Sequence, residues 1–296
     1  MSSQPADAPR VLHWRDGALE PAGGSAGGRA EPGGGPAGGP ASGPADGPGD
    51  EPGPAPGIAV ADSWLVRDGR ALAIGVHRER FLRHAGSAGL PAADGEAFWD
   101  AAIDRIPREG DWFPRVELRG DGGLLLRLRR APGRGRSLRV VTHRGADPRS
   151  APGTKGPDLD GLGSLREAAR ERGADDLVIL DAGCVAETTT SALMWWRGEA
   201  VCVPPDGMER IESVTERVVL TLATALGLEV HREAVAPHEL DGLELWALNA
   251  LHGARIVTGW AEGPRLAEDP GRLEAWRRRL EALRKPLPPI VFREAD

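Results

Sequence analysis

Two residues near the middle of the chain have side chains suited to covalent and acid–base chemistry. Lys155 opens a loop before a predicted helix, and Glu187 follows an apolar run that predicts a buried strand. A lysine amine becomes a nucleophile when burial and nearby cations lower its pKa. The only other lysine, Lys285, stands beside a proline at the end of a predicted exposed helix. Lys155 is therefore the candidate nucleophile, and Glu187 is a candidate site carboxylate for which a surface position is the alternative.

The residues between Lys155 and Glu187 predict the elements that position them. Ser164 and Glu167 have the S-x-x-E spacing of a helix start, and Gly173 predicts the end of that helix. Residues 177–180 form a short apolar run that indicates a buried strand. Residues 192–203 form two apolar runs around an Arg-Gly turn, a pattern typical of a hairpin.

Composition limits the classes of protein and of site that the chain can form. Its 296 residues suffice for two medium cores, and its net charge of −7 argues against a general nucleic-acid binder. The two cysteines, Cys184 and Cys202, lie in no metal-binding or disulfide pattern, so no metal site is predicted. The N-terminus lacks a signal-peptide pattern, and no apolar run approaches the roughly 20 residues of a membrane span. We therefore expect a cytoplasmic protein with no membrane segment.

Shifts in composition divide the chain into segments. Residues 21–57 are almost entirely Gly, Pro, Ala and small polar residues, which predicts a disordered insertion; a proline-rich ligand for a partner domain is the alternative. Residues 138–142 are expected to form the last strand of a small α+β domain. The predicted segments are an N-terminal hairpin of the small domain at 1–20, the insertion at 21–57, the small domain at 58–144, an interdomain loop at 145–153 and a large domain at 154–296.

Two stretches carry a resemblance to a known family. Lys155, the helix after it, and residues 173–193 (GADDLVILDAGCVAETTTSAL) resemble the large domain of the class IV aminotransferases, the fold-type IV pyridoxal-phosphate enzymes. Residues 249–257 (NALHGARIV) resemble the N-[SA]-L-x-G-x-R-x-V segment of the aminodeoxychorismate lyase branch. The resemblance covers residues 58–260. It implies an α+β / α/β fold of two domains, with the cofactor cleft between them.

Pyridoxal phosphate needs an amine, a carboxylate for its ring nitrogen, and an anion site for its phosphate. By resemblance, Lys155 supplies the amine, Glu187 the carboxylate, and Arg80 in an H-x-x-R-F element reaches the phosphate. Residues 213–215 align with the family's phosphate-binding turn, although Ser213 and Glu216 also fit a plain capping box. The expected cofactor-binding residues are Arg80, Lys155, Glu187, Ile211, Val214, Thr215 and Ala250, and the expected substrate-binding residues are Asn249 and Arg255.

The resemblance implies a pyridoxal-phosphate lyase that acts on a small molecule, 4-amino-4-deoxychorismate, and releases pyruvate to leave 4-aminobenzoate. Lys155 would carry the proton in this reaction. One alternative is an aminotransferase acting on branched-chain or D-amino acids, which the absence of any tyrosine disfavours. A second alternative is a non-catalytic relative, kept open by Glu216 and the Gly-rich insertion. The family precedent also implies a homodimer.

Overall fold

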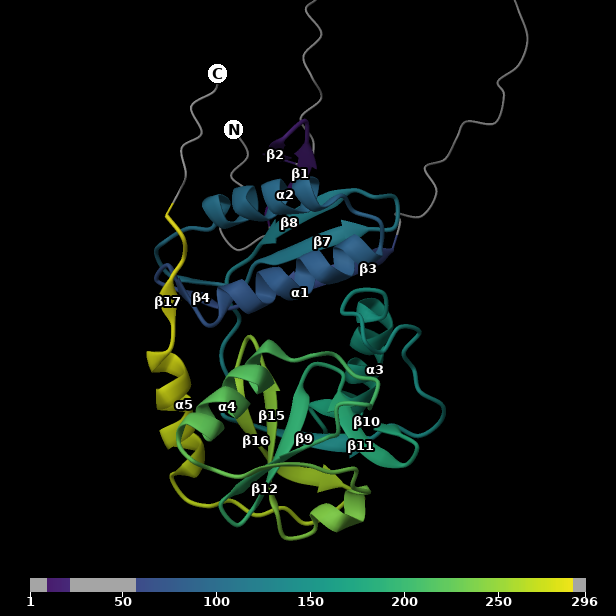
Figure 1. The fold of residues 1–296 in the computed structure, drawn as a ribbon. Helices are drawn as coiled ribbons and strands as arrows, with labels where there is room; N and C mark the ends of the chain where they lie inside the picture. The colour runs from purple at the N-terminus through teal and green to yellow at the C-terminus, as the bar shows by residue number, and fades with distance from the viewer. Residues whose placement is uncertain (1–9, 22–56, 290–296) are drawn as a thin grey trace, which may run out of the picture.

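Alternating apolar residues in the first part of the chain build a five-stranded antiparallel sheet. The computed structural model describes residues 10–21 and 57–289 (Figure 1). The strand order is β2-β1-β8-β7-β3, and β1 and β2 form the predicted hairpin around Asp16 and Gly17. The strands are β1 (Arg10–Arg15), β2 (Ala18–Pro21), β3 (Ile58–Ser63), β7 (Arg115–Arg119) and β8 (Leu124–Leu128).

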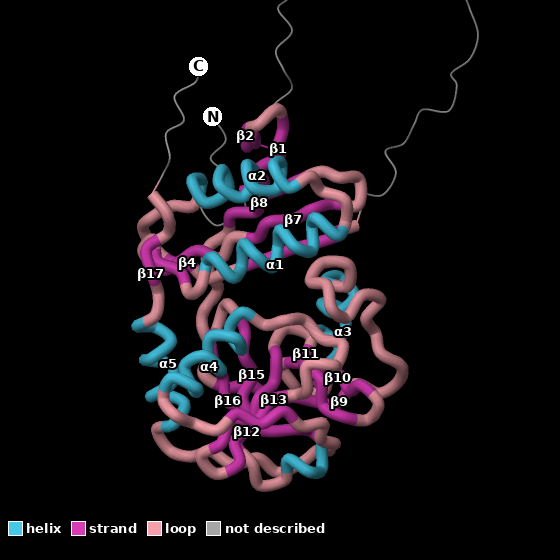
Figure 2. Tube along the Cα trace, viewed as in Figure 1, coloured by secondary structure: helices cyan, strands magenta, loops and turns pink. Residues whose placement is uncertain are grey.

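Two helices complete this first lobe, α1 (Ile74–Ser87) and α2 (Ala92–Arg105). Both lie across the sheet, as Figure 2 shows. Their buried aromatic side chains, Phe81 on α1 and Phe98 and Trp99 on α2, enter a core that includes Leu126 of β8. Burial of such side chains stabilises the lobe by about 1.5–3 kcal/mol each, before the entropy cost of ordering them.

The second lobe is built on an eight-stranded mixed sheet with the order β11-β10-β9-β16-β15-β12-β13-β14. An additional pairing between β11 and β12 curls this sheet back on itself. The strands are β9 (Ser137–Thr142), β10 (Asp176–Asp181), β11 (Cys184–Thr188), β12 (Ala192–Arg197), β13 (Ala200–Val203), β14 (Val230–Arg232), β15 (Glu244–Asn249) and β16 (Gly253–Ala261).

The central strand β12 is apolar from Ala192 to Trp196 because both of its faces are covered there. Leu193 and Trp195 enter one core cluster, whereas Met194 and Trp196 enter another on the opposite face. The helices of this lobe are α3 (Leu159–Glu171), α4 (Val214–Ala225), the short η1 (Pro237–Leu240) and α5 (Arg272–Ala282). No helix of the described residues is long and apolar enough to cross a membrane.

The C-terminal end of the described chain returns to the first lobe. There β17 (Lys285–Pro286) joins a small sheet with the order β17-β5-β4-β6, which contains β4 (Val66–Arg67), β5 (Arg70–Ala71) and β6 (Asp111–Trp112). The backbone N–H of Leu287 donates to the Gly69 carbonyl at 2.8 Å, and Arg284 Nη1 donates to the Leu65 carbonyl at 3.0 Å. The two lobes are therefore joined at their C-terminal edge as well as by the connection before β9.

Two sequence predictions about elements were wrong. β9, expected as the last strand of the small domain, pairs in parallel with β10 and β16 of the eight-stranded sheet. The predicted helix start at Ser164 lies inside α3, where the Ser164 hydroxyl donates to the Asp160 carbonyl at 3.2 Å. Burial of Leu162 extends the helix toward its N-terminus and overrides the local signal. The insertion predicted at 21–57 lies almost wholly outside the described residues, and the domain limits stay predictions.

Candidate active site

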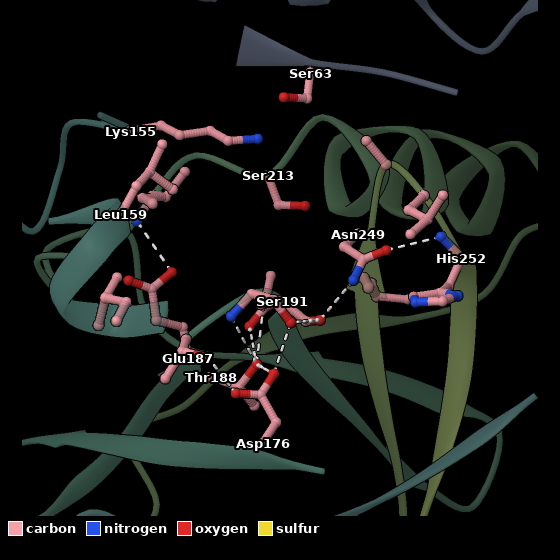
Figure 3. Close-up of a pocket in the computed structure, with 18 of the residues that line it drawn as sticks. Ser63, Lys155, Leu159, Asp176, Glu187, Thr188, Ser191, Ser213, Asn249 and His252 are labelled. Atoms are coloured by element: carbon pink, nitrogen blue, oxygen red, sulfur yellow. Dashed lines mark hydrogen bonds between the residues drawn. The ribbon is translucent and has the colours of Figure 1, made fainter. Parts of the chain in front are cut away.

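One cavity between the lobes is lined by every site residue predicted from the sequence. Its volume is about 630 Å³, and its walls come from α1, β7, α3, β11 and β15 among other segments. Figure 3 shows Lys155 and Ser63 on one side of the cavity and Asn249 and His252 on another. The structure therefore brings together Arg80, Lys155, Glu187, Ile211, Val214, Thr215, Asn249, Ala250 and Arg255.

The loop that carries Lys155 sits directly on the backbone of β3. The Lys155 carbonyl accepts a hydrogen bond from the Ala61 N–H at 2.6 Å. Gly156 follows with φ +154°, and a Cβ there would lie 2.8 Å from the Ala59 carbonyl oxygen and 2.8 Å from the Val60 Cα. Only glycine allows this approach without displacing backbone. The first lobe thus fixes the start of the Lys155 side chain.

The surroundings of Lys155 favour its neutral amine. The residue is half-buried, and its side chain extends into the cavity (Figure 3). Burial lowers the pKa of the amine to about 8, with the nearby Arg80 cation acting in the same direction and Asp62 opposing it. A neutral amine is the nucleophilic form, so this position suits the predicted role.

Arg80 is held by a buried acid that the sequence prediction missed. Its Nε and Nη2 both donate to the Asp62 carboxylate at 2.9 Å, and its Nη1 donates to the Glu212 carbonyl at 2.6 Å. Asp62 also accepts a hydrogen bond from His77 Nδ1 at 2.8 Å. A guanidinium has five N–H donors, so Arg80 keeps donors for a further anion.

The charge of Asp62 follows from these contacts. Burial alone would raise the pKa of its carboxyl, but the Arg80 guanidinium and His77 outweigh burial and hold that pKa well below its usual range. Burial lowers the pKa of His77. Asp62 is therefore an ionised carboxylate that keeps Arg80 at the boundary between the lobes. An acidic residue inside an otherwise apolar strand, at 58–62, was the available sequence signal.

Glu187 projects from β11 and is only 4% exposed. It forms an ion pair with Arg149 Nη1 and accepts a long hydrogen bond of 3.3 Å from the Ile211 N–H. Burial raises the pKa of this carboxyl to about 7, against the opposing effect of Arg149. Arg149 also pairs with Asp147 at 2.6 Å. Glu187 thus sits where a cationic partner in the cavity would favour its ionised form.

The N-terminus of α4 supplies anion-binding N–H groups. Ser213 is the N-cap, and its Oγ accepts from the Glu216 N–H at 3.2 Å. The N–H groups of Val214 and Thr215 lie in the first turn, where a helix offers no internal partner, and both residues line the cavity. The Glu216 side chain pairs with Arg210 at 2.7 and 2.8 Å, so only half of the capping box forms.

Asn249 closes the turn between β15 and β16. Its Nδ2 donates to Ser191 Oγ at 3.0 Å, and its Oδ1 accepts from the His252 N–H at 2.8 Å (Figure 3). Both ends of the amide are therefore used within the protein, and Asn249 positions the turn. Ala250, within this turn, and Arg255, on β16, also line the cavity.

These features fit the cofactor predicted from the sequence. The cavity holds an amine of lowered pKa, a buried carboxylate of raised pKa, and a helix N-terminus beside an arginine with spare donors. These are the partners needed by an aldehyde, by a protonated ring nitrogen and by a phosphate, respectively.

One family model matches most of the chain. The model of the class IV aminotransferases matches residues 59–260. No curated protein sequence matches the chain. A fold IV transaminase structure from Curtobacterium pusillum is 19% identical with a TM-score of 0.69, covering 93% of this chain and 97% of that one.

Two further structures are similar in fold. The pyridoxal-phosphate-bound form of a hypothetical aminotransferase from Mycobacterium tuberculosis is 20% identical to this chain, with a TM-score of 0.66. The match covers 76% of this chain and 88% of that one. A protein from Legionella pneumophila, proposed to be a 4-amino-4-deoxychorismate lyase, is 15% identical with a TM-score of 0.64. The match covers 78% of this chain and 97% of that one. At these identities the likeness concerns the fold.

Proposed function

We propose, from the premise that the chain belongs to the class IV aminotransferase family, that it is a lyase acting on 4-amino-4-deoxychorismate. The family comprises pyridoxal-phosphate enzymes with an α+β fold of two domains, which confirms the predicted family, fold and cofactor and the prediction that the protein is an enzyme. The proposed reaction releases pyruvate and leaves 4-aminobenzoate. The observation that carries it is the segment at residues 249–255, a turn and the start of β16, whose lyase-like sequence lines the same cavity as Lys155.

The residues of this chain divide the binding task among themselves. Lys155 would hold the cofactor covalently, and Arg80 with the N–H groups of Val214 and Thr215 would hold its phosphate. Glu187 would keep the ring nitrogen protonated. When bound, pyridoxal phosphate withdraws electrons from the substrate carbon that bears the amine.

Lys155 is the proton carrier of the proposed reaction. With the substrate bound, the Lys155 Nζ would accept the proton from the amine-bearing carbon. A pKa of about 8 places this group near the pH at which proton transfer in both directions is efficient. The same Nζ then returns the proton to the departing three-carbon fragment, which leaves as pyruvate, while the ring becomes aromatic.

The absence of tyrosine supports the lyase over the aminotransferase alternative. The protein contains no tyrosine, the residue that contacts the cofactor's phenolic oxygen in branched-chain aminotransferases. In this chain the side of the cavity near Lys155 is instead lined by arginines, among them Arg115 and Arg129. Cationic walls suit a substrate with carboxylate groups better than an aliphatic side chain.

The test is a product assay on the purified enzyme loaded with pyridoxal phosphate. With 4-amino-4-deoxychorismate we expect pyruvate and 4-aminobenzoate in equal amounts, measured by coupled lactate dehydrogenase and by fluorescence. A parallel reaction supplies D-alanine or L-isoleucine as amino donor with 2-oxoglutarate as acceptor. Formation of glutamate there, without pyruvate release from the first substrate, would favour the aminotransferase.

A further inference from the structure

A group of arginines surrounds His252 at the Asn249 end of the cavity. Arg166 projects from α3 and Arg255 from β16, and both line the cavity. In each the Nε–H is buried and has no hydrogen-bond partner among the described residues. A buried donor without an acceptor costs about 1–3 kcal/mol, so proteins rarely leave one unused. Neither guanidinium donates a hydrogen bond to a described residue, and the Nη groups are not among the buried atoms, so these groups are available to an acceptor from outside the chain.

The acidic residues near these arginines are already engaged. Asp176, the carboxylate that most favours the charged form of Arg255, accepts hydrogen bonds from Thr188 at 2.9 Å and Thr190 at 2.6 Å, and also from Thr189. Asp175 accepts from the Arg139 N–H at 2.7 Å. Burial lowers the pKa of Arg255, and Arg166 lowers it further. Burial and the Arg166 cation therefore outweigh the two aspartates at Arg255, and a further anion bound here would favour its charged form.

His252 adds an uncharged donor to this region. Its Nδ1 accepts a hydrogen bond from the Gly135 N–H at 3.1 Å, so the ring proton of the neutral form is on Nε2. Among the described residues Nε2 has no hydrogen-bond partner, and the residue lines the cavity. Burial lowers the pKa of His252 to about 4, and the Arg255, Arg134 and Arg277 cations lower it in the same direction. The ring is neutral at physiological pH and can donate only from Nε2.

We propose that Arg166, Arg255 and His252 form a subsite for the ring carboxylate of the substrate. Guanidinium groups bind carboxylate through charge-assisted hydrogen bonds, and a neutral imidazole adds a donor without a further positive charge to repel the arginines. The subsite rests on the proposed function in one respect, that this cavity is where the substrate binds. It adds Arg166 and His252, which no sequence motif indicated, and it makes a carboxylate a condition for tight binding.

The subsite predicts discrimination between an acid and its amide. An uncharged amide offers the two guanidinium groups no charged acceptor, and a site built to bond a charged group rejects the analogue that lacks it. The experiment compares 4-aminobenzoate with 4-aminobenzamide by isothermal titration calorimetry, using the enzyme loaded with pyridoxal phosphate. We expect the acid to bind at least about tenfold more tightly than the amide.

Four variants locate that preference. Arg166→Gln and His252→Phe should each reduce the acid-over-amide ratio at least about threefold, whereas His252→Gln, which keeps an N–H donor, should restore most of it. Arg172→Gln, on an exposed residue just after α3, is the matched control and should leave the ratio unchanged. Thermal melting and the visible cofactor band identify any variant that fails to fold or to bind the cofactor.

The outcomes separate this inference from the proposed function. A wild-type enzyme that binds the acid no more tightly than the amide, or does not bind the acid, overturns the subsite. The same holds if the ratio is unchanged in both Arg166→Gln and His252→Phe while these variants keep the cofactor band. If the ratio behaves as expected but no pyruvate is released from 4-amino-4-deoxychorismate, the subsite stands and the lyase proposal fails.

Discussion

Among single residues, the proposed reaction depends most on the protonation state of the Lys155 amine. An ordinary lysine, with a pKa near 10.4, holds about one neutral amine in 10³ at pH 7. Burial and the Arg80 cation lower the pKa of Lys155 to about 8, so about a tenth of the molecules hold a neutral amine there. Because Arg80 is itself fixed by Asp62, this effect is built into the fold.

The first prediction concerns this pKa. The rate at which trinitrobenzenesulfonate labels Lys155 in the cofactor-free protein should rise about tenfold per pH unit below pH 8 and level off above it. The sign follows from the chemistry, because only the neutral amine reacts and its fraction grows until the pKa is passed. Labelling is measured by mass spectrometry of the peptide that contains Lys155. The Lys155→Ala variant gives the background from Lys285 and the N-terminal amine, and a midpoint near pH 10.4 would contradict the prediction.

Residue type and position singled out Lys155 and Glu187, the family resemblance added Arg80, and all three line one cavity. The partners that set their charge could not be predicted in this way. Asp62 is 18 residues from Arg80 in the sequence, and Arg149 is 38 residues from Glu187. Neither pair belongs to a local pattern such as a cap or a helix turn, so only the tertiary fold brings them together.

At the scale of elements, the active-site loop depends on its contact with β3. The Lys155 carbonyl bonds to Ala61, and Gly156 has no room for a Cβ against Ala59 and Val60. The N-terminus of α4 meets the same boundary, because Arg80 of α1 donates to the carbonyl of Glu212 just before it. Both contacts pair an element of one lobe with a loop of the other.

The second prediction is that Gly156→Ala separates the lysine loop from β3. The added Cβ would overlap backbone atoms that cannot rotate away, so we expect a loss of at least about 2 kcal/mol in the free energy of unfolding. Weakened cofactor binding should accompany it. Urea denaturation measures the first effect, and a cofactor titration the second. Gly153→Ala is the control, since a Cβ there meets nothing within 4 Å; equal stability of the two variants would refute the argument.

Sequence periodicity predicted where the apolar strands of the second lobe lie in the chain better than it predicted which strands pair with one another. The run at 177–180 lies within β10, and the hairpin at 192–203 forms β12 and β13. The sheet to which β9 belongs was mispredicted because its partners are distant in the sequence. Long segments separate β9 from both β10 and β16, so no local pattern indicates the pairing. The start of α3 was mispredicted because packing of Leu162 outweighed the local Ser164 signal.

At the scale of the whole molecule, the cavity exists only while the lobes keep their relative placement. The C-terminal end contributes to this, because α5 packs on the eight-stranded sheet and β17 pairs with β5 of the first lobe. Leu287 is buried in the core of the first lobe and is 6% exposed. The homodimer implied by the family resemblance stays a prediction.

The third prediction tests this C-terminal connection. Leu287→Ala should lower the free energy of unfolding by about 2–4 kcal/mol, because it removes a side chain from the first lobe's core. Leu283→Ala is the matched control, since Leu283 is 41% exposed and its loss should change stability by less than about 0.5 kcal/mol. Chemical denaturation of both variants decides the matter. Similar stability in the two would show that the C-terminal segment does not support the first lobe.

The most direct test of the central claim is an absorbance spectrum of the purified protein with pyridoxal phosphate, recorded for the natural sequence and for Lys155→Ala. We predict a visible band from the cofactor bound covalently to Lys155, stable to gel filtration and absent from the variant. Glu167→Gln, on an exposed side chain of α3, should keep the band. A natural protein that takes up no cofactor, or a Lys155→Ala variant with an unchanged band, would contradict the assignment of this cavity as the active site.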